Sequence, residues 1–181
     1  MLDRPTRKIA VVLLREVVED SRWESHRWQV LGVVPDVGGE ARTIHEDRAT
    51  LHRLFPGLDL TLFADEAEGY YLNVASPAPC WFVLWRMEEA ASVAAEPIPR
   101  PQIVTLSYNE AARWMDAQET VEQVPAPPHV VEWMRAFAAE HYVPEPKKRK
   151  RPESFRRLED HFGQPASVTT EKKYGGGDGH G

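Results

Sequence analysis

Seven histidines are the residues of this sequence with the widest chemical range, since a histidine can bind a metal or transfer a proton. A zinc site needs ligands at a clamp-like spacing, such as two histidines at positions i and i+4 of one helix. The closest pair, His45 and His52, is seven residues apart. His129 and His141 are twelve apart, a spacing that puts them on different faces of a helix. The sequence therefore predicts scattered histidines and no metal site.

The other groups that could carry out covalent or acid–base chemistry are a single cysteine and several carboxylates. Cys80 precedes an apolar stretch and has no base spaced with it, so we expect a core residue and not a nucleophile. The acids of residues 65–68 fall in a predicted turn and Glu88 and Glu89 at a strand end, where carboxylates are normally solvated. No catalytic residue is predicted.

The glycines of this sequence do not form a phosphate-binding loop. Such a loop reads Gly-x-x-x-x-Gly-Lys-Ser/Thr between a strand and a helix, and neither this pattern nor a dinucleotide fingerprint occurs. Gly38 and Gly39 are followed by Glu40, whose carboxylate would repel a phosphate. The sequence therefore predicts no bound cofactor.

A run of consecutive cations is the strongest electrostatic feature of the chain: Lys147, Lys148, Arg149, Lys150 and Arg151. Such a run attracts anionic partners, but it has no interleaved aromatic residues, which argues against binding of single-stranded nucleic acid. We expect it to bind a protein partner or the acidic body of its own fold, and nucleic acid is not the expected partner. The alternative is a solvated tail that only adds solubility.

Core packing accounts for most of the six tryptophans, but their number leaves room for an exposed aromatic pair at an interface. Trp114 and Trp133 fall on two predicted helices. We predict that these two residues and the basic run 147–151 bind a partner.

The composition suits a cytoplasmic protein with one domain and a tail. Of 181 residues, 42% are hydrophobic and 28% charged, which fits one domain of ~100–150 residues. A single cysteine excludes an internal disulfide, and no apolar run approaches the ~20 residues that span a bilayer. The apolar stretch of residues 9–14 is too short for a signal peptide.

The charge changes sign along the chain. Residues 1–144 hold 22 acidic and 13 Lys or Arg side chains, a net charge of −9, whereas residues 145–181 hold 6 and 9, a net charge of +3. We therefore predict a single domain over residues 1–144 and a tail over residues 145–181. The tail is basic and then Gly-rich, so it lacks the apolar residues of a packed structure and is expected to be disordered.

Apolar and β-branched runs predict an antiparallel sheet of six or seven strands, among residues 8–15, 28–34, 41–46, 58–63, 70–74, 81–86 and 102–106. Residues 58–63 alternate apolar and polar side chains, and residues 64–69 are predicted to turn the chain back. Short strands with tight turns pair antiparallel, since parallel pairing needs long crossovers. Such a sheet can roll towards a barrel.

Two helices are predicted after these strands, over residues 109–117 and 128–141, with a short extended segment at 120–124 between them. Ser107 and Glu110 have the spacing of a capping box at the first helix. The second helix has a predicted buried face of Val130, Trp133, Met134, Phe137 and His141. The expected fold is therefore α+β, with two C-terminal helices packed on one side of the sheet.

Several segments carry a family resemblance: Arg27–Pro35, Leu58–Phe63, Trp81–Trp85, Ile103–Ala111, Val121–Pro128, Phe137–Val143 and Lys147–Arg151. Together they resemble an uncharacterised domain family of proteobacteria whose genes typically neighbour those of formate dehydrogenase and its maturation factors. The resemblance covers roughly residues 7–151.

The resemblance implies a role in making, loading or regulating a molybdenum- or tungsten-dependent formate dehydrogenase, and it carries over no catalytic residue. The expected function is a non-catalytic accessory or assembly protein that binds formate dehydrogenase subunits or maturation factors. Two alternatives stay open: an enzyme of molybdopterin cofactor metabolism, and a regulator that binds nucleic acid or a small molecule. The acidic segment 15–20, which has no glycine after the first predicted strand, argues against a guanylyltransferase.

Overall fold

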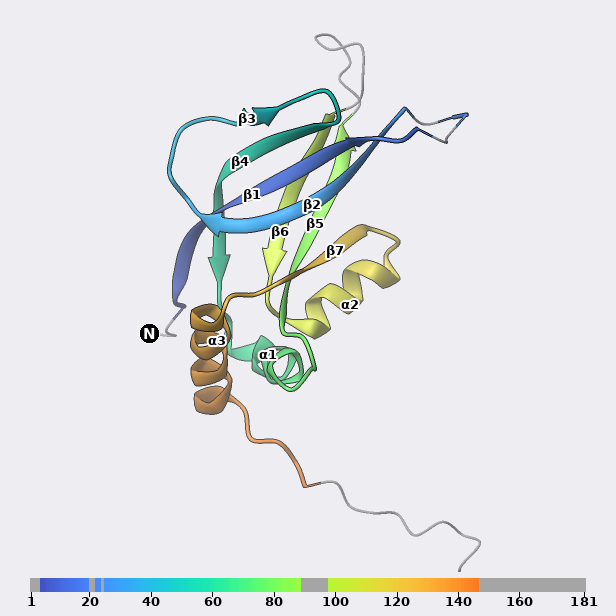
Figure 1. Ribbon diagram of the computed structural model, residues 1–181. Coiled ribbons are helices and arrows are strands. Elements are labelled where there is room, and N and C mark those ends of the chain that lie inside the picture. Colours follow the sequence, from blue (N-terminus) through green and yellow to red (C-terminus); the bar gives the residue numbers. More distant parts are fainter. Residues whose placement is uncertain (1–3, 20–21, 24, 89–97, 147–181) are drawn as a thin grey trace, which may run out of the picture. The chain divides into compact units, whose positions relative to one another are not determined.

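The computed structural model describes residues 4–19, 22–23, 25–88 and 98–146, and its first sheet has four antiparallel strands (Figure 1). These strands are β1 (Thr6–Val17), β2 (His26–Pro35), β3 (Arg42–Glu46) and β4 (Thr50–Thr61), in the order β2-β1-β4-β3. Of the strand predicted at residues 58–63, residues 58–61 form the end of β4, and the sequence had not joined them to residues 50–57. The basic run and the Gly-rich end lie outside the described residues, so the boundary at residue 144 stays a prediction.

The second sheet has three antiparallel strands, β5 (Cys80–Glu88), β6 (Ile98–Thr105) and β7 (Thr120–Pro125), in the order β6-β5-β7. Its edges approach the first sheet, because β7 lies against β2 and β6 lies against β4. Antiparallel pairing within an α+β fold is therefore confirmed. The expectation of one sheet is wrong, since the seven strands divide into two sheets.

The two sheets do not close into a barrel within the described residues. Where β2 meets β7, the Oε2 atom of Glu122 accepts hydrogen bonds from the Val30 backbone N–H at 3.1 Å and from the Trp85 indole. A side-chain oxygen thus occupies the position that a backbone carbonyl would have in a continuous ladder. On the other side, Pro99 and Pro101 deprive β6 of two backbone donors, which suits it to a sheet edge.

A helix replaces the predicted turn and strand at residues 64–74. The chain forms a short 3-10 helix, η1 (Ala64–Glu66), followed by α1 (Ala67–Val74). Ala67, Tyr70 and Asn73 are buried, and their three-residue spacing is that of a helix. The prediction failed because residues 70–74 are aromatic and β-branched, a composition that favours strands when contacts are ignored.

The described residues thus form three α-helices where the sequence predicted two. The helices α2 (Tyr108–Asp116) and α3 (Pro128–His141) lie where they were predicted. Helix α1 packs against α3 and touches α2, and Figure 1 shows α1 and α3 at one end of the strands. None of the described helices is both long enough and apolar enough to span a bilayer, and the longest, α3, has 14 residues.

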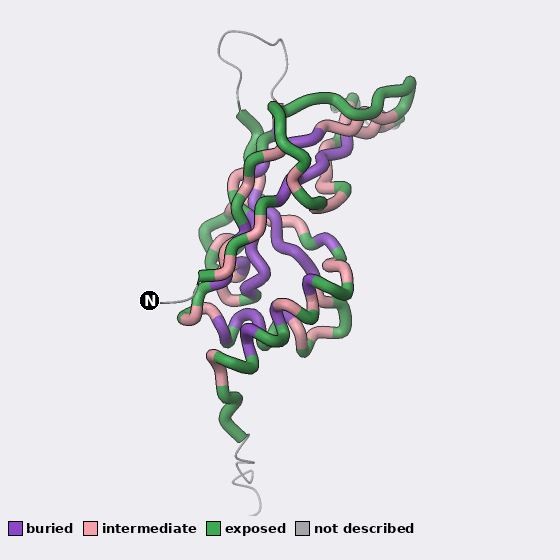
Figure 2. Tube along the Cα trace, turned by 90° about the vertical axis from the view of Figure 1, so that its left-hand side faces the viewer, coloured by how far each residue is buried: buried purple, intermediate pink, exposed green. Residues whose placement is uncertain are grey.

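The main core lies where the two sheets and α3 meet. Figure 2 shows buried stretches, in purple, on both the strands and the helices. From α3, Val130, Met134 and Phe137 are buried as predicted, whereas Trp133 and His141 are only half-buried. Ala138 completes the buried face in their place. Full burial of a side chain such as Met134 contributes roughly 1.5–3 kcal/mol, so this face anchors the helix.

Candidate functional site

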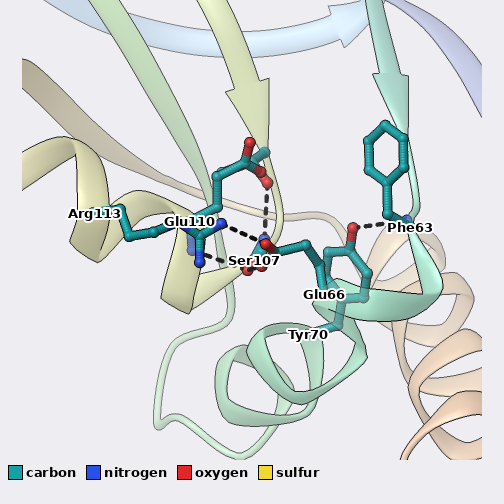
Figure 3. Close-up of polar contacts among 7 residues, drawn as sticks. Phe63, Glu66, Tyr70, Ser107, Glu110 and Arg113 are labelled. Carbon is teal, nitrogen blue, oxygen red and sulfur yellow. Dashed lines mark hydrogen bonds and ion pairs between the residues drawn. The ribbon is translucent and has the colours of Figure 1, made fainter.

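A buried polar cluster joins η1 to the start of α2 (Figure 3). Ser107 is fully buried and caps α2, since its Oγ accepts a hydrogen bond from the backbone N–H of Glu110 at 3.1 Å. The same hydroxyl donates to Oε2 of Glu66 at 2.5 Å, and Glu66 also forms an ion pair with Arg113. The predicted Ser107 cap is therefore confirmed, and its hydroxyl proton is bound by Glu66 of η1.

The packing around Ser107 leaves no space for a substrate. A Cβ built on Gly69 of α1 would lie 2.1 Å from the Ser107 Oγ, so the chain segments touch at this point. The Ser107 hydroxyl already donates one hydrogen bond and accepts another. Because Ser107 is fully buried, its hydroxyl is not accessible to a group that it could attack. The cluster fixes α1 against α2, and Glu66 is a half-buried structural carboxylate where the sequence predicted a solvated one.

Two further side chains have their acid–base chemistry set by burial. Burial raises the pKa of Tyr70 to about 12, and its hydroxyl accepts a hydrogen bond from the backbone N–H of Phe63 at 3.0 Å (Figure 3). Burial also raises the pKa of the Cys80 thiol, whose Sγ lies 3.9 Å from Oε1 of Gln123. Both groups stay protonated at neutral pH, and the prediction that Cys80 is a buried core residue is confirmed.

Among the described residues, no three His, Cys, Asp or Glu side chains are grouped so that they could hold a metal ion. His129 is exposed near the start of α3, and the ring of His141 stacks on Phe137 with the centroids 4.2 Å apart. His45 and His52, by contrast, lie opposite each other on β3 and β4. The sequence did not predict this neighbourhood because the strand pattern of residues 41–46 is weak.

The two tryptophans predicted to bind a partner lie in different clusters. Trp114 of α2 is half-buried and packs beside Cys80, in a small cluster separate from the main core. Trp133 of α3 is half-buried against the main core, and the guanidinium carbon of Arg7 lies 4.1 Å from its ring centroid. The structure therefore does not bring the two indoles together. The basic run 147–151, the rest of the predicted surface, lies outside the described residues.

An open apolar groove, which we call the α1–α3 groove, runs between α1 and the end of α3. Its volume is about 420 Å³. It is lined by Tyr71, Val74, Arg135, Ala138, Ala139, Tyr142, Val143 and Pro144. The ring centroids of Tyr71 and Tyr142 are 5.3 Å apart, and Val143 is 85% exposed. Aromatic rings and methyl groups exposed in one concave surface are typical of a site that binds another molecule.

Sequence reasoning missed this groove because it placed residues 70–74 in a strand. In a strand, Tyr71 and Val74 point to opposite faces, whereas on a helix residues three apart share one face. The available signal was the acidic group at Asp65, Glu66 and Glu68, since acids stabilise the first turn of a helix.

A family model for a protein of unknown function, DUF3305, matches residues 8–151. The matched range includes almost all of β1, every later described helix and strand, and the basic run. No curated protein and no solved structure matches the chain.

Proposed function

This chain belongs to the DUF3305 family of proteins of unknown function, and we propose that it is a non-catalytic accessory protein that binds another protein through the α1–α3 groove. The observation that carries the proposal is the open apolar groove with the Tyr71 and Tyr142 rings side by side. The proposed partner is a formate dehydrogenase subunit or maturation factor, which rests on the resemblance described from the sequence. A cytoplasmic location is part of the same proposal.

Burial of the groove by a partner is energetically favourable. Tyr71 is 38% exposed and Val143 is 85% exposed, so a partner would remove substantial apolar surface from water. Such burial contributes roughly 25 cal/mol per Å², and tyrosines often dominate the binding energy of an interface. The groove is also largely preformed, because α1 and α3 pack on each other and the two tyrosine rings are already in contact.

The charge at the groove indicates the chemistry of the partner. Arg135 is the one charged residue among the lining residues, and its side chain is 51% exposed. It pairs with Glu132 on the same helix, and an exposed pair of this kind contributes little free energy. A carboxylate of the partner can therefore replace Glu132. We expect the partner to present an apolar segment with an acidic side chain beside it.

The contacts predicted from the sequence remain secondary parts of the proposal. Trp114 and Trp133 are half-buried and do not line the groove, so we expect them to contribute less to binding than Tyr71 and Tyr142. The basic run 147–151 begins three residues after Pro144, the last lining residue of the groove, and remains a predicted electrostatic contact. The alternatives, an enzyme of molybdopterin metabolism and a regulator, stay predictions.

Affinity-tagged co-purification from the native host grown with formate tests the proposal, with formate dehydrogenase subunits and maturation factors quantified by mass spectrometry. The groove variant is Ala139→Glu, which puts a charge at an exposed position of the apolar wall. The matched control is Val37→Glu, because Val37 is 70% exposed and lies after the end of β2. We expect the unchanged chain and the control to enrich these proteins and the groove variant to lose them.

Thermal unfolding of both variants establishes that each remains folded. If the unchanged chain enriches no formate dehydrogenase protein, the proposed partner is wrong. If Ala139→Glu recovers as much partner as the control, the groove is not the contact. Replacement of the five cations of 147–151 by serine tests the electrostatic contact, and recovery should fall and lose its dependence on salt.

A further inference from the structure

The turn between β3 and β4 brings two histidines together. His45 and His52 are directly opposite in the antiparallel register, and their ring centroids are 4.8 Å apart with the ring planes at 49°. His52 is half-buried and lies opposite Leu14 of β1, whereas the His45 side chain is 50% exposed. The pair is therefore fixed on one side by the sheet and open to solvent on the other.

Asp47 orients the ring of His45. The Nε2 atom of His45 lies 3.1 Å from Oδ2 of Asp47, and an ionised carboxylate only accepts hydrogen bonds, so Nε2 carries the proton. Asp47 is itself held in place, since its Oδ1 accepts from the backbone N–H groups of Ala49 at 2.8 Å and Thr50 at 2.7 Å. In the neutral imidazole, the nitrogen without a proton is then Nδ1 of His45. A carboxylate bonded to the second nitrogen of an imidazole is the usual support of a metal-binding histidine.

His52 can supply a second nitrogen. Within the described part of the chain, no hydrogen bond engages either of its ring nitrogens. A metal ion lies about 2.1 Å from a bound imidazole nitrogen and therefore about 3.2 Å from the centroid of that ring. Two imidazoles that bind one ion at the octahedral angle of about 90° or the tetrahedral angle of about 109° have ring centroids about 4.5 to 5.2 Å apart. The separation of 4.8 Å between the His45 and His52 centroids falls within this range.

We propose that His45 and His52 form a two-histidine site for a divalent transition-metal ion of the zinc, nickel and copper group, with Asp47 as the residue that positions His45. Imidazole is the ligand type that these ions share. The protein supplies two ligands, so the other coordination positions are filled by water or by a donor from another molecule. The site is independent of the α1–α3 groove.

Isothermal titration of the full-length, untagged chain with ZnCl₂ and with NiCl₂ tests the site. The variants are His45→Ala, His52→Ala and Asp47→Asn, and the matched control is His129→Ala, which removes an exposed histidine from α3. We expect saturable binding of one ion per chain, unchanged in the control and abolished in both single-histidine variants. Asp47→Asn should weaken binding by about 10-fold or more, the usual effect of losing such a support.

Thermal unfolding without metal checks that the variants are folded. A chain that binds neither ion, or binds equally well without His45 or without His52, would overturn the two-histidine site. Affinity that does not change in Asp47→Asn would overturn the positioning role of Asp47. Parallel chemical-shift changes of both imidazoles during the titration would support the shared ion directly.

Discussion

Around α1 and α2, polar side chains are buried and bonded on several sides, whereas at the β3–β4 turn they are exposed and keep unbonded atoms. Asn73 is 1% exposed, and its amide donates to the carbonyls of Cys80 and Leu106 at 2.8 Å and accepts from the Cys80 N–H at 3.0 Å. At the turn, the His45 ring is bonded through one nitrogen. Buried polar residues here hold elements together, while exposed ones remain available to a ligand.

The largest effect on the free energy of unfolding is expected from Asn73→Ala. The substitution removes the hydrogen bonds that the side chain makes to two backbone carbonyls and one N–H in a buried place, which should lower the free energy of unfolding by roughly 3–5 kcal/mol. Urea unfolding monitored by tryptophan fluorescence measures it. The control is Asn109→Ala on α2, whose side chain has no hydrogen bond among the described residues and should cost under about 1 kcal/mol. Equal losses in the two variants would show that the buried hydrogen bonds of Asn73 do not hold these elements together.

Because the phenol of Tyr70 is buried, we expect the free energy of unfolding to fall at alkaline pH. The pKa of this phenol is about 12 in the folded chain and 10.0 ordinarily. Between pH 10 and pH 12, the unfolded chain therefore releases the phenol proton while the folded chain keeps it. The contribution is fully present below pH 10 and is lost as the pH rises towards 12, up to about 3 kcal/mol. Tyr70→Phe should flatten this dependence in urea unfolding, at a cost of about 1 kcal/mol for the lost bond to Phe63.

Tyr108→Phe is the matched control for this measurement, because Tyr108 is 47% exposed. Its alkaline stability profile should match that of the unchanged chain. A profile that keeps its slope between pH 10 and 12 in Tyr70→Phe would show that another group dominates there.

Gly69→Ala should destabilise the protein by about 1–2 kcal/mol, although alanine is favoured over glycine inside a helix by about 1 kcal/mol. The added Cβ would lie 2.1 Å from the Ser107 Oγ and 3.2 Å from the Asn109 backbone nitrogen, so the α1–α2 contact must open. The matched control is Gly32→Ala on β2, where a Cβ has nothing within 4 Å. Chemical unfolding of both variants checks the contrast, and a stabilised Gly69→Ala chain would contradict the close contact.

The elements that the sequence predicted correctly have patterns set by neighbouring residues. The Ser107 cap and the apolar spacing of α3 are of this kind. Helix α1 could not be predicted in this way, because its buried face is decided by contacts far along the chain. Asn73 bonds the carbonyl of Leu106, 33 residues away, and no local pattern contains that information.

The candidate sites depend on the same distant contacts. The groove requires Tyr71 to lie on a helix that packs against α3. It could not be predicted once residues 70–74 were placed in a strand. The histidine pair requires the register between β3 and β4, which a weakly patterned strand does not reveal. The number of tryptophans led to the prediction that Trp114 and Trp133 form a partner surface, but both indoles are partly buried against the core clusters.

The smallest effect on the free energy of unfolding is expected from Asp47→Asn, because Asp47 is hydrogen-bonded but exposed. Hydrogen bonds from the Ala49 and Thr50 N–H groups, and then from His45, hold the pKa of Asp47 well below its usual range. The sign follows from linkage: the contribution is present above the unfolded pKa of about 3.9 and is lost as the pH falls below it. The amide shifts of Ala49 and Thr50 should therefore titrate in acid with a midpoint below about 3.9.

Asp47→Asn keeps an acceptor oxygen and should abolish that titration while global unfolding stays almost unchanged, in contrast to Asn73→Ala. If Asp47→Asn were as destabilising as Asn73→Ala, the turn would be a structural support like the α1–α2 contact and not a free surface.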